Sequence, residues 1–223
     1  MDSDFADWVE HALGHAPRDM ALYARALTHG SQGGPTYERL EFLGDRVLGL
    51  AVAAWLYGRF PDEPEGKLSA RLNALVSRER CAEVGRVIGV PQRLILGKQA
   101  RDDGANLSDN VIGDAMEALV GALFCETDFA TAAACVRRLW GPSLDLLADA
   151  PKHAKSALQE WAAAHQCRPP LYTLEARHGP HHAPRFTVRV EVGGSRGGSA
   201  TAEGGSKQEA EKEAATTLLA QLA

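Results

Sequence analysis

The sequence lacks the segments that carry a chain to a membrane or across one. No uninterrupted apolar run is long enough to span a bilayer. The first thirteen residues have neither a basic start nor an apolar centre, and they contain Asp2, Asp4, Asp7 and Glu10, so they do not have the pattern of a secretory signal. The 223 residues are 45% hydrophobic, which is enough to bury the core of one or two soluble domains.

Paired cysteines are also missing. The four cysteines are Cys81, Cys125, Cys135 and Cys167, and no two of them have C-x-x-C spacing. This scatter indicates reduced thiols in a cytoplasmic protein and not a disulfide framework. The cysteines and the dispersed histidines also supply neither a zinc site nor a nucleophilic triad.

The chain has no overall excess of basic charge, since its net charge is −5. A nucleic-acid-binding protein usually derives much of its affinity from Lys and Arg contacts with phosphates. The charge is unevenly distributed, however. Residues 152–223 hold nine basic and seven acidic residues, a net +2, and five of the eight histidines, whereas the rest of the chain holds fifteen basic and twenty-two acidic residues, a net −7. This asymmetry fits an acidic, cation-binding part joined to a weakly basic part, although an excess of +2 does not by itself identify a nucleic-acid-binding domain.

Acidic residues lie inside an apolar helical run at residues 38–49. With about 3.6 residues per turn, Glu38, Glu41 and Asp45 fall on one stripe of the predicted helix. Carboxylates that converge in this way repel one another, and they are costly to bury unless a cation offsets their charge. The cation is either an arginine or a metal ion.

A second apolar helix with acids on one face is predicted at residues 109–124. Its acids are Asp114 and Glu117, three positions apart. If the acidic faces of the two helices pack against each other, four carboxylates meet in one pocket. Oxygen ligands at that density favour Mg²⁺ or Mn²⁺ over zinc.

The same residues carry a resemblance to a known family. Residues 38–45, ERLEFLGD, are similar to the signature of the ribonuclease III family, and residues 113–124, GDAMEALVGALF, resemble its second acidic helix. The C-terminal segment resembles a double-stranded-RNA-binding domain, so the resemblance covers nearly the whole chain. It implies the following site residues: Glu41, Asp45, Asp114 and Glu117 as catalytic metal ligands, with Glu38 and Glu65 as supporting acids near the scissile bond.

Arginines offer a second explanation for the first acidic stripe. Acids on helices are usually solvated or paired with a nearby arginine, and Arg39 and Arg46 are available. Two acidic pairs in two apolar helices, joined to an eight-residue signature, favour the metal site. Arg46 departs from the small residue that is common after the signature aspartate. We expect it to point away and pair with an acid, because inside the pocket it would compete with metal ions.

Apolar spacing predicts an all-helical first domain over residues 1–147. Helices are expected at 4–13, at 18–28 with Pro17 near the first turn, from Glu38 to about Phe60, over Leu68–Val76, and at 79–88, 109–124 and 130–147. Turns are expected at 31–35 and 61–66. Residues 97–107 read as a polar loop, either a plain connection or a phosphate contact through Lys98 and Arg101.

A short linker at 148–152 precedes a second domain at 153–223, where the periodicity changes. A helix at 155–165, strands at 171–175, 185–192 and about 198–203, and a helix at 207–222 are predicted. The middle strand alternates apolar and polar residues with the period of two that a half-buried strand requires. The order α-β-β-β-α on about seventy residues matches the double-stranded-RNA-binding fold.

Three places in this second domain resemble RNA contacts of the family. They are Gln159 and Glu160 on the first helix, His182 in the loop 179–184, and Ser206 with Lys207 at the start of the last helix. The family usually has more Lys or Arg after Ser206, whereas this chain has Gln208 and Glu209, so we expect weak, salt-sensitive binding. Ser206 and Glu209 also form a capping box, which would simply start the helix.

The predicted function is hydrolysis of double-stranded RNA by a homodimer, with Mg²⁺, or Mn²⁺ as a substitute, lowering the pKa of a bound water. The products would have 5′-phosphate and 3′-hydroxyl ends with short 3′ overhangs, and the resemblance implies processing of ribosomal RNA precursors and other RNAs. Phe42 would either cross between subunits or belong to the ordinary core.

Two other functions stay open. A non-cleaving RNA-binding scaffold would be expected to lack one of the metal ligands. A small nucleotide phosphohydrolase has no use for a domain that reads a duplex.

Overall fold

The computed structural model describes residues 3–147, 154–179 and 184–222. It forms two compact units, Met1–Pro151 and Lys152–Ala223, each with its own hydrophobic core. The predicted linker at 148–152 lies outside the described residues. Within the described ranges, no helix is both long and apolar enough to cross a membrane.

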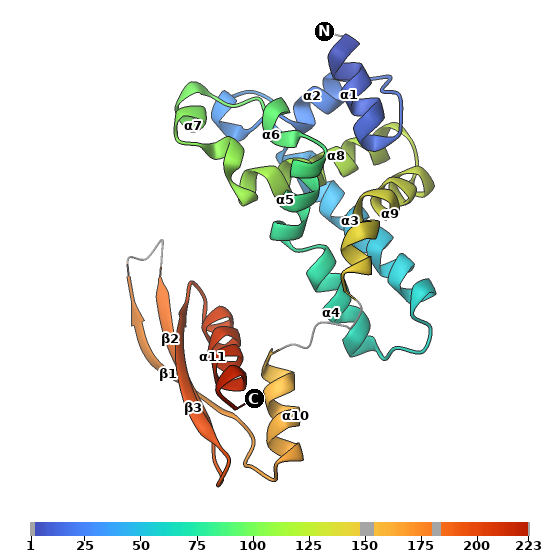
Figure 1. Ribbon diagram of the computed structural model, residues 1–223. Coiled ribbons are helices and arrows are strands. Elements are labelled where there is room, and N and C mark those ends of the chain that lie inside the picture. The colour runs from blue at the N-terminus through green and yellow to red at the C-terminus, as the bar shows by residue number, and fades with distance from the viewer. Residues whose placement is uncertain (1–2, 148–153, 180–183, 223) are drawn as a thin grey trace. The chain divides into compact units, whose positions relative to one another are not determined.

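The N-terminal unit is built of helices (Figure 1). In chain order they are α1 (Ser3–Leu13), α2 (Met20–Ala26), η1 (Gly30–Gln32), α3 (Glu38–Arg59), α4 (Glu65–Leu75), α5 (Arg78–Val87), α6 (Val90–Arg93), α7 (Lys98–Asp102), η2 (Ala105–Leu107), α8 (Asp109–Glu126) and α9 (Phe129–Asp145). The one strand-like pairing in the described part of this unit is a parallel bridge between Thr28 and Ile95. The all-helical prediction for the first domain is therefore confirmed.

Helices α3 and α8 form the centre of this unit and pack along each other. Along α8, eleven residues are buried, including Ile112, Met116 and Leu119. A helix enclosed on most sides needs an apolar sequence over most of its surface, and α8 has one apart from its acids. Glycines allow the close approach of the two helices: a Cβ built on Gly121 of α8 would lie only 2.3 Å from the carbonyl oxygen of Leu40 on α3.

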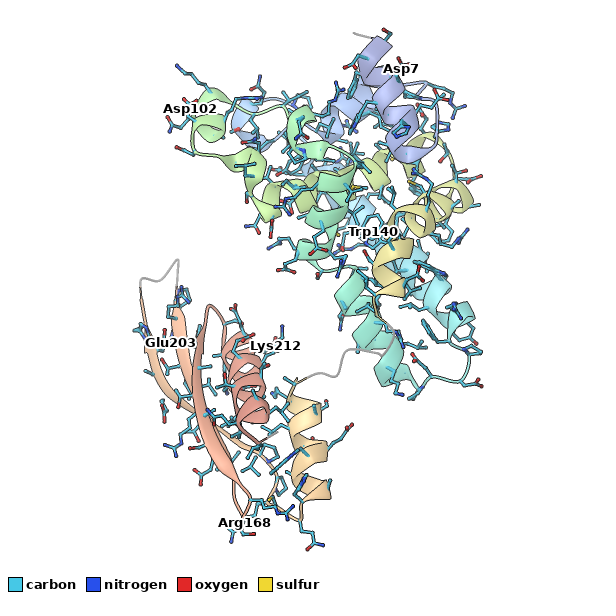
Figure 2. The ribbon with its side chains drawn as sticks, in the orientation of Figure 1. Asp7, Asp102, Trp140, Arg168, Glu203 and Lys212 are labelled. Carbon is cyan, nitrogen blue, oxygen red and sulfur yellow. The ribbon has the colours of Figure 1, made fainter. Side chains whose placement is uncertain are left out.

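Two tryptophans link outer helices to other segments of the unit. The side chain of Trp140 on α9, labelled in Figure 2, is fully buried, and its indole N–H donates a 2.8 Å hydrogen bond to the carbonyl of Leu75. The indole N–H of Trp8 on α1 donates a 2.7 Å hydrogen bond to the carbonyl of Ile88. Both bonds join segments far apart in the sequence and satisfy a polar group on a large apolar side chain.

The second helix is shorter than predicted, and Pro17 is not in its first turn. It begins at Met20, because the Asp19 side chain accepts hydrogen bonds from the backbone N–H groups of Ala21 and Leu22, at 3.0 and 3.2 Å, and so caps the helix there. Glu126 accepts the backbone N–H of Asp19 at 2.6 Å and holds this residue outside the helix. Such a long-range contact is not visible in local sequence.

Two other predicted loop boundaries in this unit are wrong. The polar segment 97–107 is not a plain loop, since it contains the short helices α7 and η2, each preceded by a glycine. The predicted turn at 61–66 ends earlier, because α4 begins at Glu65. The negative charge of Glu65 in the first turn interacts favourably with the helix dipole and stabilises this start. Both segments are polar, and polarity alone does not distinguish a loop from a short exposed helix.

The C-terminal unit contains α10 (Ala154–Ala164), β1 (Leu171–His178), β2 (Arg185–Val192), β3 (Gly198–Gly204) and α11 (Lys207–Leu222). The strands form one antiparallel sheet in the order β1-β2-β3. α11 packs on β2 and β3, and α10 packs on α11, so both helices lie on the same face of the sheet (Figure 1). The predicted order α-β-β-β-α is confirmed.

The predicted alternation of the middle strand is also confirmed. Val188, Val190 and Val192 are buried, whereas Arg189 and Glu191 are exposed on the other face. β1 is longer than the predicted 171–175, because an irregularity after Leu174 lets pairing continue as far as His178 opposite Arg185.

Candidate active site

A pocket of about 350 Å³ opens between α3, α5 and α8 of the N-terminal unit. Its lining residues are Glu41, Phe42, Asp45, Arg46, Val76, Arg78, Asp114 and Glu117. The two acids of α3 are one turn apart, and so are the two acids of α8, so each helix presents its pair on one face. The structure thus brings the four predicted metal ligands together from two distant parts of the chain.

The pocket disfavours negative charge. Burial, together with the carboxylates of Asp45, Asp114 and Glu41, raises the pKa of Glu117 to about 7. Burial is also the main reason that the pKa values of Glu41 and Asp114 are raised, and for Glu41 the neighbouring Asp114 adds to the effect. Four carboxylates gathered in one pocket favour the entry of a cation.

Arg78 is a cation of the pocket that sequence reasoning missed. It is the first residue of α5, it lines the pocket, and its charge lowers the pKa of Glu41, Asp114 and Glu117. Arginine at the start of a polar helix is common on protein surfaces, so the local sequence contains no signal for this role. Only the packing of α5 against α8 reveals it.

Tyr37 and Cys81 also contact the acids and were not predicted. The buried Tyr37 lies beside Asp114, and this polar neighbour lowers the pKa of that carboxyl against the effect of burial. The Cys81 thiol lies near Glu117, and burial together with that carboxylate raises the pKa of Cys81, which keeps the thiol protonated. These neighbours set the electrostatic surroundings of the two carboxylates of α8.

The position of Arg46 only partly matches its prediction. It forms an ion pair with an acid, as expected, but that acid is Asp45, and Arg46 lines the pocket instead of pointing away from it. Its guanidinium also lies 4.7 Å from the ring centre of Phe42. The ring of Phe42 is 64% exposed, so Phe42 does not belong to the core of the single chain.

The two predicted supporting acids lie outside this pocket lining. Glu38 is exposed on the first turn of α3, close enough for its charge to raise the pKa of Glu41. Glu65 is exposed at the start of α4, where it accepts a 2.6 Å hydrogen bond from the hydroxyl of Ser69. Within one chain, therefore, Glu65 is not brought to the other acids.

The donor set of the pocket fits a hard divalent cation, because every acidic ligand offers oxygen. Among the residues that the structure describes, no three His, Cys, Asp or Glu side chains are already gathered closely enough to hold a metal ion by themselves. An open arrangement of this kind suits Mg²⁺, which keeps several of its waters and is held by few protein carboxylates together with phosphate oxygens. It does not suit a closed structural site.

The predicted RNA contacts of the C-terminal unit are at its surface where the structure describes them. Gln159 and Glu160 are exposed on α10, and Ser206 and Lys207 are exposed at the start of α11, whereas His182 lies outside the described residues. Figure 2 labels Lys212 further along α11.

Much of the charge at the start of α11 is neutralised within the domain. The ammonium nitrogen of Lys155 lies 2.5 Å from one carboxylate oxygen of Glu211, and that of Lys207 lies 3.8 Å from the other. The Ser206 hydroxyl accepts the N–H of Glu209 at 3.1 Å, and the Glu209 side chain accepts the N–H of Gly205 at 2.7 Å, so the capping role expected for this turn is present.

Family models match both units. The model described as Ribonuclease-III-like matches residues 19–143, and the model described as double-stranded RNA binding motif matches residues 154–222. The chain belongs to the ribonuclease III family. Enzymes of this family are metal-dependent nucleases, so the N-terminal unit is a nuclease domain and the C-terminal unit is a double-stranded-RNA-binding domain.

Individual members of the ribonuclease III family are similar over nearly the whole chain. Ribonuclease 3 of Zymomonas mobilis is 57% identical over 98% of this chain and 89% of its own, and Ribonuclease 3 of Jannaschia sp. is 46% identical over 95% and 93%. A crystal structure of the ribonuclease III nuclease domain from Campylobacter jejuni, 30% identical, aligns with a TM-score of 0.60 over 64% of this chain and 97% of its own. Another structure of that domain, 32% identical with a TM-score of 0.58 over 60% and 94%, is described as flexible in a region involved in dimer formation.

Proposed function

We propose that this ribonuclease III family enzyme is a cytoplasmic, homodimeric endonuclease that hydrolyses both strands of duplex RNA with Mg²⁺, or Mn²⁺ as a substitute. Its products have 5′-phosphate and 3′-hydroxyl ends with short 3′ overhangs, and its substrates include ribosomal RNA precursors. Residues 1–147 carry cleavage and residues 153–223 carry duplex binding.

The observation that supports this proposal is the meeting of four carboxylates in one pocket, from two helices far apart in the sequence. Glu41, Asp45, Asp114 and Glu117 hold the cation, and Glu38 and Glu65 act as supporting acids. A divalent cation at this position supplies Lewis acidity, which activates water and offsets negative charge on the phosphodiester. No side-chain nucleophile is required.

The protein's own side chains position the carboxylates and partly balance their charge. Tyr37 lies beside Asp114 and the Cys81 thiol lies near Glu117, where these polar groups serve as neighbours that orient the carboxylates. The charge of Arg78 lowers the pKa of Glu41, Asp114 and Glu117 and so partly opposes the effect of burial.

The second domain selects duplex RNA. Gln159, Glu160 and His182 read the 2′-hydroxyls of the minor groove, and Ser206 and Lys207 contact phosphates across the major groove. Because Glu211 lies 3.8 Å from the ammonium of Lys207 and offsets part of its charge, binding by this domain is weak and sensitive to salt.

Dimerisation follows from the geometry of a duplex. One pocket positions one scissile phosphate at a time, so cutting both strands requires two pockets or a rebinding step. A two-fold dimer supplies two pockets of opposite polarity, matching the antiparallel strands. The exposed Phe42 beside the pocket is suited to cross into a second subunit.

The deciding experiment incubates the full chain with a long duplex RNA and a single-stranded RNA of equal length, with Mg²⁺ or with excess chelator. We expect cleavage of the duplex alone, in Mg²⁺ alone. Equal cleavage of both RNAs, or full activity in chelator, would overturn the proposal. Tight duplex binding without any cleavage would instead support the non-cleaving scaffold.

A further inference from the structure

Two guanidinium groups line the pocket, and they differ in their partners. Arg46 is paired with Asp45 and lies over Phe42. Arg78 makes no hydrogen bond or ion pair with any residue that the structure describes, although its charge reaches three of the four carboxylates. The pocket therefore contains one arginine whose five N–H donors are free for a ligand.

The base of this side chain is held in place while its end is exposed. Ser77 caps α5 by accepting the N–H of Arg80 at 3.2 Å, which fixes the start of the helix. The backbone of Arg78 rests on α8 at Gly113, where a Cβ would lie 3.1 Å from the Arg78 carbonyl oxygen and 3.3 Å from its Cγ. Gly113 immediately precedes Asp114, so Arg78 is anchored beside a predicted metal ligand.

We propose that Arg78 binds a non-bridging oxygen of the RNA phosphate that lies over the four carboxylates. This inference rests on the proposed function. A phosphodiester that approaches four carboxylates needs positive charge on the protein side as well as the cation, and a guanidinium matches the geometry of phosphate oxygens in two parallel hydrogen bonds. A bound cation would offset the charge of the carboxylates and weaken their attraction for Arg78. The N–H groups of the Arg78 guanidinium would then be available to hydrogen-bond the phosphate oxygens.

A simpler role for Arg78 would be to offset the charge of the carboxylates without touching RNA. The two roles have different consequences. A phosphate contact adds one released counterion to RNA engagement, so its loss lowers the salt dependence of kcat/KM. A pure counter-charge affects the Mg²⁺ concentration needed for half-maximal activity and leaves the salt dependence unchanged.

The test compares the wild-type full chain with Arg78→Gln, Arg78→Lys and a matched control, Arg80→Gln. Arg80 lies on the same helix, is paired with Glu83 and is not part of the pocket lining. For each protein, kcat/KM for a short duplex RNA is measured in Mg²⁺ over a range of KCl concentrations. Melting temperature and Mg²⁺ titration are recorded in parallel.

For Arg78→Gln we expect kcat/KM to fall about tenfold at moderate salt, and the slope of its logarithm against the logarithm of salt concentration to fall in size by about one. Arg78→Lys should keep the slope, because it keeps the charge, and lose part of kcat/KM, because it lacks the planar fork. Arg80→Gln should match the wild type. Arg78→Lys also serves as the test if Arg78→Gln fails to fold, since equal kcat/KM for Lys and Arg would then overturn the inference.

An unchanged slope in Arg78→Gln, with or without a shift in the Mg²⁺ midpoint, overturns the phosphate contact, and so does an equal loss in Arg80→Gln. Absence of cleavage by the wild type is a different result, because it overturns the proposed function and this inference with it.

Discussion

Gly44 of α3 lies directly against the main chain of Glu117 on α8. A Cβ built on Gly44 would be 1.8 Å from the carbonyl oxygen of Glu117, far inside any possible contact distance. Because Gly44 immediately precedes Asp45, this close approach sets how near the acids of one helix come to those of the other. The missing side chain at position 44 is thus a condition for the pocket.

Gly44→Ala should separate α3 from α8 and destabilise the nuclease domain by about 3 kcal/mol, the upper part of the usual range for overpacking a core. Gly49→Ala is the control on the same helix, since nothing lies within 4 Å of a Cβ there, and it should stabilise the domain by about 0.5 to 1 kcal/mol. Urea unfolding followed by circular dichroism measures both. Equal stability of the two variants would show that the close approach is unimportant.

Glu117→Gln should abolish RNA cleavage and leave RNA binding nearly intact, because it removes a charged ligand without changing shape. Cleavage assays and binding titrations in the same Mg²⁺ buffer check this. A variant that cuts at close to the wild-type rate in moderate Mg²⁺ would contradict the assignment of Glu117 as a ligand.

The same variant should change how stability depends on pH. The pKa of Glu117 is about 7 in the folded protein and near 4.5 as a free side chain, so its contribution to stability is present below about pH 4.5 and is lost as the pH rises to 7. Without metal, Glu117→Gln should therefore melt about 2 to 4 °C above the wild type at pH 8, the effect of about 1 kcal/mol after allowance for solvent screening. The difference should vanish near pH 4.5, and a gain that does not depend on pH would count against burial as its cause.

Phe42→Ala should weaken the proposed dimer and slow the cutting of both strands. Tyr57→Ala is the control, because Tyr57 is also on α3 and its side chain is 77% exposed. Sedimentation velocity and native gels of the duplex products are the measurements. A wild-type monomer at working concentration, with products nicked on one strand only, would rule the dimer mechanism out.

Deletion of residues 152–223 should leave a folded nuclease domain that still cleaves duplex RNA at low salt or with Mn²⁺. All four predicted ligands precede residue 152, and each unit has its own core. Circular dichroism checks folding, and a cleavage assay at several salt concentrations checks activity. A deletion protein that folds but is inert under all these conditions would mean that the second domain takes part in catalysis.

Local periodicity was enough to predict most elements of this chain and the four acids that line its pocket. The alternation of Val188, Val190 and Val192 with polar residues predicts a half-buried strand, because successive side chains of a strand point to opposite faces. The spacing of Asp114 and Glu117 likewise places both acids on one face of a helix before any tertiary contact is known. These features depend on neighbours within a few residues, which a sequence displays directly.

Features that depend on distant contacts came only from the tertiary structure. The start of α2 is set by Asp19 together with Glu126, and the pairing of Arg46 depends on which side of α3 faces the pocket. Arg78 and Tyr37 join the acids only because α5 and the start of α3 pack against α8. The pocket exists because glycines let two helices, far apart in the chain, approach until their main chains touch, and no local pattern encodes which residues meet across such a contact.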